Sequence, residues 1–334
     1  MQYEFELKTG LKAVCQAARI CRKVQQGISP SQLDKKDKSP VTIADFASQI
    51  VVSQALKMAF PNDPIIGEED SNDLQAETQA PFRGEIRQLA QMVGVSLDDD
   101  QMYALLDRCS TDEHCPRYWT VDPIDGTKGF LRKEQYAISL GLVVEGKVVL
   151  GILGCPNLPV SGVEPDTTGG QLYWGIAGVG AYRQSFTSAE TGGASTEFPV
   201  TVSKSNSAEH SRFCESVESG HSSHGWSDHV ATEMGITSAP VRLDSQAKYA
   251  IVARGDAEAY LRLPTRVGYV EKIWDHAGGV GVIEAAGGQV TDIHGKPLEF
   301  CHGRGLKANQ GVVVSNGAFH AQLIEAITKH APAE

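Results

Sequence analysis

Apolar residues recur every three or four positions near the start of the chain, a pattern that predicts two amphipathic helices. The first stripe spans residues 7–27. The second begins near Thr42 and ends before Pro61, because proline cannot continue a helix. Residues 84–108 also show helical periodicity, on a more polar background. We therefore expect helices over residues 3–60 ahead of the first long β-rich segment.

Short β-rich segments separated by turn residues fill the middle of the chain, which predicts an antiparallel sheet. The dipeptide Glu145-Gly146 lies between two of them and is a strong hairpin signal. An earlier segment at 64–67 is expected to be a short strand with Glu68 and Glu69 at its end. The strands predicted for the sheet cover residues 118–121, 136–144, 147–155, 171–177 and 181–183.

The last third of the chain alternates short strands with helices. A strand is expected to restart at 200–202, and a helix to run over about 275–286. At 334 residues the chain exceeds the size that one hydrophobic core usually supports. We therefore predict an α/β (α+β) fold of alternating helix and sheet layers, with domains at 1–198 and 199–334 and a linker at 186–196.

The composition restricts the partners of the protein. Hydrophobic residues make up 41% and charged residues 21%, as in globular domains. The longest apolar runs are far shorter than the roughly 20 residues of a membrane helix, so no membrane partner is expected. The formal charge of −11 argues against nucleic acid as a partner, because such a surface needs clustered Lys and Arg. An anionic substrate then requires local cations, either metal ions or placed basic side chains.

The N-terminus and the cysteines bear on the compartment. Residues 1–7 are acidic and lack a signal or transit pattern, so we expect a cytoplasmic location, or a plastid or mitochondrion if a transit peptide has been removed. Seven scattered cysteines without a Cys-x-x-Cys pair favour a reducing compartment. Cys109 and Cys115 are close enough for a regulatory disulfide, although loop thiols are mostly plain thiols.

The segment Asp122-Pro-Ile-Asp-Gly-Thr127 carries the clearest chemistry in the sequence. Two carboxylates three positions apart repel each other unless a cation lies between them, and hard oxygen donors select Mg²⁺ or a similar ion. A bare Asp-x-x-Asp is more often an Asx-turn, but the neighbouring Pro, Gly and Thr favour the metal. The turn at 126–129 is expected to open a helix whose amides hold a phosphate oxygen, whereas Thr127 alone could be just a helix cap.

The motif at 122–127, together with Trp274–Gly278 and Gly67–Glu69, resembles the inositol monophosphatase family of lithium-sensitive, metal-dependent phosphatases. The resemblance covers nearly the whole chain and implies the αβαβα sandwich of that family. The stretch 108–117 departs from it, since it lacks a Glu-Gly-Gly core, and the conformation of this loop is not transferred. Five further segments are similar to the plant and fungal 3′(2′),5′-bisphosphate nucleotidase branch: 38–45, 220–224, 243–249, 260–264 and 271–275.

This resemblance implies a phosphatase that hydrolyses the 3′-phosphate of 3′-phosphoadenosine 5′-phosphate (PAP), with its sulfated precursor PAPS as a further substrate, and that is inhibited by Li⁺ and Na⁺. A monomer or weak homodimer is expected. Asp45 and Thr127 would take the proton from the attacking water. Two to three Mg²⁺ ions would be held by Glu68, Asp122, the carbonyl of Ile124, Asp125 and Asp275. The substrate would contact Gly126, Thr127, His221, Ser245, Lys248, Arg262 and Asp275.

Two other functions stay open at this point. An inositol polyphosphate 1-phosphatase shares the metal core but recognises a cyclitol, and the segments 221–224 and 245–248 favour the nucleotide instead. A catalytically silent nucleotide or redox sensor belongs to another class. The presence of Asp45, Thr127 and all the metal-binding acids argues against it.

Overall fold

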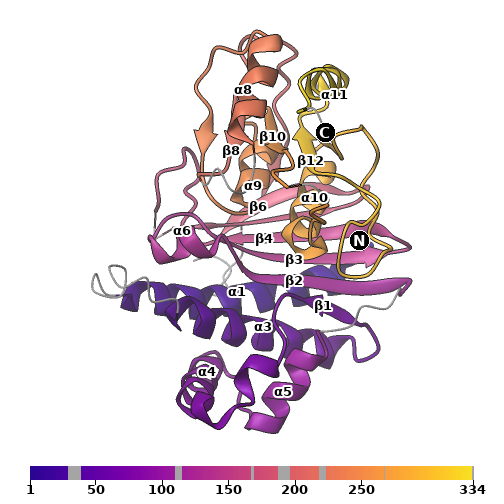
Figure 1. The fold of residues 1–334 in the computed structure, drawn as a ribbon. Coiled ribbons are helices and arrows are strands. Elements are labelled where there is room, and N and C mark those ends of the chain that lie inside the picture. Colours follow the sequence, from indigo (N-terminus) through magenta and orange to yellow (C-terminus); the bar gives the residue numbers. More distant parts are fainter. Residues whose placement is uncertain are drawn as a thin grey trace.

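Helices and two β-sheets stack in alternating layers in the computed structural model (Figure 1). This layered α/β class is the one predicted from the sequence, and it is confirmed. None of the described helices combines the length and apolar character needed to cross a membrane. The structure describes residues 1–28, 39–109, 115–166, 169–186, 196–217, 223–266 and 268–332.

Two long helices form the layer beneath the first sheet, α1 (Glu4–Gly27) and α3 (Ser39–Ala59). They pack on each other, α1 against strand β4 and α3 against strand β2 (Figure 1). The apolar stripe of α1 accounts for this, since Leu7, Val14 and Cys21 are all buried. Helix α3 begins three residues before the predicted start at Thr42. Its first turn includes Pro40, and proline is tolerated there because N–H groups of a first turn have no partner within the helix.

The first sheet has seven strands in chain order. Strands β1 and β2 pair in parallel and all later neighbours are antiparallel, which confirms the predicted meander. Strand β2 extends past the predicted end, with an irregular register between Asp122 and Asp125. The strands are β1 (Ile65–Gly67), β2 (Arg117–Asp125), β3 (Ala137–Val144), β4 (Lys147–Cys155), β5 (Gln171–Ile176), β6 (Gly180–Ser185) and β7 (Phe198–Val200).

Strand β7 pairs with β6 and so completes the first sheet. The strand expected at 200–202 therefore begins two residues earlier and belongs to this sheet. The predicted domain boundary at 198/199 falls within β7 and stays a prediction. Most of the linker expected at 186–196 lies outside the described residues, and Phe186 is fully buried in the core.

The other face of the first sheet is covered by α9 (Ala247–Ala253) and α10 (Ala277–Ala285) (Figure 1). Helix α10 approaches closely, since a Cβ placed on Gly151 would lie only 2.2 Å from the carbonyl oxygen of Gly278. Asp275 does not open this helix as predicted. It lies in the preceding 3₁₀ turn η3 (Ile273–Asp275), whose end turns the chain into α10.

A second sheet of five strands lies beyond these helices. Helices α8 (His224–Glu233) and α11 (His320–Lys329) contact each other on its outer side (Figure 1). One hydrophobic cluster joins both sheets through α9 and α10. The strand order is β11 (Gln289–Thr291), β12 (Val312–Ser315), β10 (Ala259–Arg262), β8 (Phe213–Glu215) and β9 (Val241–Arg242).

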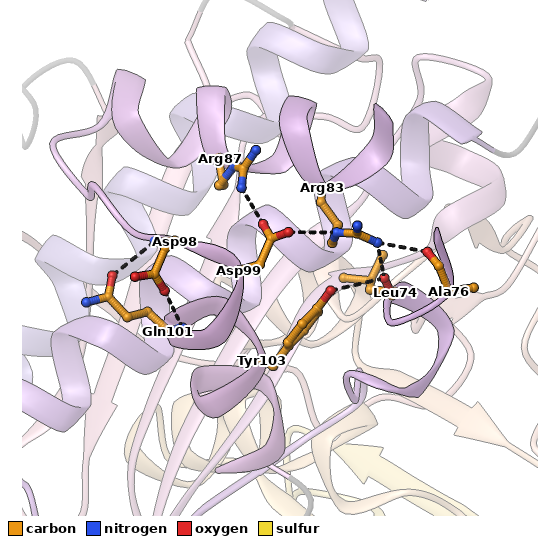
Figure 2. A network of polar contacts seen from close by, with 8 residues as sticks. All are labelled: Leu74, Ala76, Arg83, Arg87, Asp98, Asp99, Gln101 and Tyr103. Atoms are coloured by element: carbon orange, nitrogen blue, oxygen red, sulfur yellow. Dashed lines mark hydrogen bonds and ion pairs between the residues drawn. The ribbon is translucent and has the colours of Figure 1, made fainter. Parts of the chain in front are cut away.

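The helical periodicity predicted over 84–108 corresponds to two helices, α4 (Ala80–Met92) and α5 (Asp99–Asp107), which pack on α3. Figure 2 shows the polar contacts that join them: Asp99 accepts from Arg83 at 2.9 Å and also from Arg87. Arg83 also donates hydrogen bonds to the carbonyls of Leu74 and Ala76. Leu74 ends the 3₁₀ turn η1 (Asn72–Leu74), and Ala76 directly precedes the 3₁₀ turn η2 (Glu77–Gln79). The chain that follows β1 is thereby tied to the helical layer.

Candidate active site

The end of β1 lies beside the middle of β2, with Gly67 opposite Val121. The next residues, Glu68 and Asp122, are therefore neighbours. Asp122 Oδ1 accepts a hydrogen bond from the backbone N–H of Ile124 at 3.1 Å. Two ionised carboxylates offer only acceptors, so they cannot hydrogen-bond each other and their charges repel. A cation between them removes that repulsion.

The pKa values of Asp122 and Glu68 are both raised by their surroundings. Burial raises the pKa of Asp122, and so do the charges of Glu68, Asp125 and Asp275. Burial and the charge of Asp125 raise the pKa of Glu68 in the same way. Such mutual repulsion in a buried site costs free energy unless a positive charge compensates it.

The donor set fits a hard divalent cation. Oxygen atoms of carboxylates and a backbone carbonyl are the ligands that Mg²⁺ takes in proteins. Burial raises the pKa of Asp45 on α3, and the charges of Glu69 and Glu68 raise it further. The Oδ1 atom of Asp45 has no hydrogen-bond partner among the described residues. A buried carboxylate oxygen without a partner is costly, so it is expected to face a ligand or water that is not part of the chain.

The backbone after β2 depends on glycine. Gly126 has φ 90°, and a Cβ there would lie 2.8 Å from the Cβ of Ser245. Only glycine combines this left-handed conformation with so close an approach. The chain then turns into the short helix α6 (Thr127–Leu131), as predicted for this turn, and Thr127 is exposed at its start.

Gln246 connects the two sides of the acid cluster. Its backbone N–H donates to Asp125 Oδ2. Its side chain donates to the carbonyl of Trp274 at 2.9 Å and accepts from Ser139 Oγ at 3.0 Å. One residue therefore positions Asp125 and the turn that carries Asp275.

The buried Lys248 and the half-buried Arg262 offset part of the negative charge. Arg262 forms ion pairs with Glu271 at 2.8 Å and with Asp275 at 3.6 Å. Lys248 Nζ donates to the carbonyl of Leu243 at 3.3 Å, and burial lowers the pKa of this lysine. Both side chains line the same cavity as the acids, so the cavity offers negative charge at one part of its wall and positive charge at another.

This cavity has a volume of about 400 Å³ and brings together residues from both halves of the chain. Asp45 is not among the described residues that line it, and His221 lies outside the described residues. The sequence-predicted site residues around the cavity are Glu68, Asp122, Ile124, Asp125, Gly126, Thr127, Ser245, Lys248, Arg262 and Asp275.

Sequence reasoning missed several lining residues. Tyr260 and Gln246 lie within motifs used for the resemblance and could have been included on that ground. Tyr269 and Lys128 also line the cavity, but no motif pointed to Tyr269. The ring of Tyr260 lies 5.1 Å from Lys248 Nζ, a separation at which an aromatic face attracts a cation.

Cys109 and Cys115, the two cysteines considered for a regulatory disulfide, differ in solvent exposure. Cys109 is fully buried, and burial raises the pKa of its thiol to about 12. Cys115 is partly exposed, and the residues between them lie outside the described part of the chain. None of the seven cysteines, all of which lie in the described part of the chain, forms a disulfide in this structure. A thiol as inert as that of Cys109 is a poor partner for rapid disulfide exchange.

The chain is similar to known proteins over nearly its whole length. The model of the inositol monophosphatase family matches residues 6–331. A Schizosaccharomyces pombe relative named 3′(2′),5′-bisphosphate nucleotidase is 41% identical over 345 residues, covering 98% of this chain and 96% of the relative. An Arabidopsis thaliana relative named 3′(2′),5′-bisphosphate nucleotidase 1 is 42% identical over 347 residues, with the same coverage. The solved structure of Mycobacterium tuberculosis SuhB shares the fold, with TM-score 0.63, 18% identity and 100% of both chains covered.

Proposed function

This chain belongs to the inositol monophosphatase family, and from that premise we propose that it is a metal-dependent phosphatase that hydrolyses the 3′-phosphate of PAP to give AMP and phosphate. The observation that carries the proposal is one cavity that is lined both by five acids and by three basic side chains, Lys128, Lys248 and Arg262. Relatives named bisphosphate nucleotidase, about 40% identical over nearly the whole chain, support the nucleotide as substrate.

The metal centre of the proposal uses the acids at the ends of β1 and β2. Glu68, Asp122 and the carbonyl of Ile124 would hold one Mg²⁺, and Asp125 and Asp275 would join Asp122 in holding a second. A third ion would be bound beside Glu68 through water. When bound, the ions lower the pKa of coordinated water and neutralise charge on the phosphate ester.

Asp45 and Thr127 would handle the proton of the attacking water. The exposed hydroxyl of Thr127 can accept a hydrogen bond from that water and donate one to a carboxylate. Asp45 is the candidate for that carboxylate, because its Oδ1 is buried without a partner in the described chain. Its raised pKa suits a group that must receive and keep a proton.

The basic wall of the cavity would bind the other end of the nucleotide. Lys248 and Arg262 would contact the 5′-phosphate, and Ser245 and His221 the nucleoside. Arg262 already pairs with Asp275, so a phosphate at Arg262 would lie beside the metal-binding acids. The same wall would hold the larger phosphosulfate group of PAPS.

Phosphate release measured side by side from PAP and from inositol 1,4-bisphosphate tests this proposal. We expect Mg²⁺-dependent release from PAP with kcat/KM at least tenfold above that for the inositol ester. A preference for inositol 1,4-bisphosphate would assign the chain to the inositol polyphosphate 1-phosphatases. Binding of PAP without phosphate release at any Mg²⁺ concentration would instead support the alternative function, a catalytically silent nucleotide sensor.

A further inference from the structure

A second group of side chains that could hold a metal ion lies on the segment that precedes Arg304. Glu299, Cys301 and His302 each offer one donor atom, and these three atoms lie within 4.8 Å of one another. The sulfur of Cys301 lies 3.6 Å from His302 Nε2, and Nε2 lies 2.8 Å from Glu299 Oε2. None of these residues belongs to the carboxylate centre described above.

The three donor atoms combine an ion-pair contact between His302 and Glu299 with a sulfur–nitrogen separation that suits a tetrahedral ion. A single ring nitrogen, His302 Nε2, faces both the thiol and the carboxylate, and one proton on it cannot serve both at full strength. Zinc bonds of about 2.3 Å to sulfur and about 2.0 Å to nitrogen at a tetrahedral angle place these two atoms about 3.5 Å apart. The sulfur–nitrogen separation of 3.6 Å is close to that value.

The backbone that carries these ligands is held in place. The hydroxyl of Tyr118 donates to the carbonyl of Phe300, and both residues are buried. The backbone N–H of Glu299 donates to Asn309 Oδ1 at 2.8 Å. A Cβ placed on Gly146, in the β3–β4 turn, would lie 3.5 Å from Cys301 Cβ, so this turn packs beside the cysteine. Ligands on a fixed backbone lose less conformational freedom when an ion binds.

We propose that Glu299, Cys301 and His302 form a binding site for a borderline-soft divalent cation of the zinc class, with water as the fourth ligand. Binding would release the thiol proton to solvent and leave a thiolate on the ion. Thiolate and imidazole favour Zn²⁺ or Co²⁺ over Mg²⁺, so this site differs in selectivity from the carboxylate centre. It lies beside Tyr118, four residues before Asp122 on β2, which corresponds to roughly 13 Å along the strand.

Titration of the full-length protein with Co²⁺ in the presence of saturating Mg²⁺ tests the site. The near-ultraviolet charge-transfer absorption of Co²⁺ requires a thiolate ligand. Co²⁺ bound at the carboxylate centre therefore does not contribute to this absorption. We expect the absorption to saturate at one Co²⁺ per chain and to be bleached by Zn²⁺. Cys301→Ser should abolish it, and His302→Ala should weaken Co²⁺ binding at least tenfold.

Matched variants make the result decisive. Cys115→Ser, at the other partly exposed cysteine, should keep the absorption, and Glu299→Gln should weaken binding by a smaller factor than His302→Ala. Circular dichroism checks that each variant is folded. Absence of the absorption in the wild-type protein, its survival in Cys301→Ser, or its loss in Cys115→Ser would each overturn the proposal. Because the readout does not involve phosphate release, these results are independent of the proposed phosphatase activity.

Discussion

The guanidinium of Arg304 donates a hydrogen bond to the carbonyl of Gly67 at 2.8 Å. Arg304 comes from the last tenth of the chain, whereas Gly67 is the last residue of β1 and precedes Glu68. The same guanidinium lies over the ring of Trp274, 4.6 Å from its centroid. Arg304 therefore holds the backbone beside Glu68 against the turn that carries Asp275, and both acids are ligands in the proposed metal centre.

Replacing Arg304 should weaken metal binding more than it destabilises the fold. In Arg304→Met the hydrogen bonds to the end of β1 are lost, and Glu68 is no longer held in one position. Outer contacts of metal ligands typically contribute 10- to 100-fold in metal affinity. We expect the Mg²⁺ concentration for half-maximal phosphate release to rise about tenfold. The exposed Arg266→Met is the control, and an unchanged Mg²⁺ requirement in Arg304→Met would show that Arg304 does not position Glu68.

Asp122→Asn should abolish turnover and still leave a folded protein. Without metal, the pKa of Asp122 is raised by burial and by the charges of its neighbours, so a neutral amide relieves repulsion. We expect the metal-free variant to unfold at a temperature equal to or above that of the wild type. The Mg²⁺-induced rise in Tm should disappear, because the variant has lost a ligand.

The control for this prediction is the same substitution at an exposed site, Asp228→Asn on α8, which should keep both turnover and the Mg²⁺-induced rise in Tm. Calorimetry with and without Mg²⁺ measures both quantities. A metal-free Asp122→Asn protein that is unfolded, or one that retains phosphate release, would contradict the role given to this carboxylate.

Gln246→Leu should both destabilise the protein and impair catalysis. The buried Gln246 side chain bonds Ser139 Oγ, the carbonyl of Trp274 and the backbone N–H of Gly279. Leucine leaves these polar groups without partners, at about 1–3 kcal/mol for each group that water cannot reach. Urea unfolding should show a loss of at least about 2 kcal/mol.

Ser139→Ala separates the two effects, since it removes only one of these hydrogen bonds and keeps the backbone pairing of residue 139 with Asp122. It should cost about 1 kcal/mol and leave the Mg²⁺ dependence of phosphate release unchanged. Gln246→Leu, in contrast, should raise the Mg²⁺ requirement, because it removes the side-chain hydrogen bond to the carbonyl of Trp274 that positions the turn carrying Asp275. Equal Mg²⁺ curves for the two variants would argue against that positioning role.

The local parts of the site could be predicted from the sequence. The acids at 122 and 125 lie on one short motif, and Glu68 follows a short strand, so pattern and resemblance were enough to identify them. The turn after Asp125 was predicted to open a helix, and α6 begins there at Thr127. These features depend on a few consecutive residues, which is why one sequence reveals them.

The contacts that hold the site together could not be predicted. Arg304 and Gly67 are 237 residues apart, and no periodicity connects them. The pairing of β7 with β6 was missed for the same reason, since a three-residue strand has no pattern of its own. Asp275 was expected to open a helix because Asp is a common N-cap, whereas His276 occupies that position and is buried.

His320 should make stability depend on pH between 4 and 6.5. Burial lowers the pKa of His320 to about 4 from an ordinary value of 6.5. Its ring nitrogens lie 2.8 Å from Thr291 Oγ1 and 2.7 Å from Ser315 Oγ. Above pH 6.5 the imidazole is neutral in both states. As the pH falls toward 4, the unfolded chain binds a proton that the folded chain resists, so the free energy of unfolding decreases.

His320→Gln removes this titration but keeps a polar side chain. We expect the variant to be about 1–2 kcal/mol less stable at pH 7.5, because the two hydrogen bonds are imperfectly replaced. Its free energy of unfolding should then fall less steeply than that of the wild type between pH 6.5 and 4, so the two curves approach each other in acid. Urea unfolding across this range measures both curves, with the exposed His210→Gln as control. Parallel curves for wild type and His320→Gln would mean that the pKa of His320 is not lowered in the folded protein.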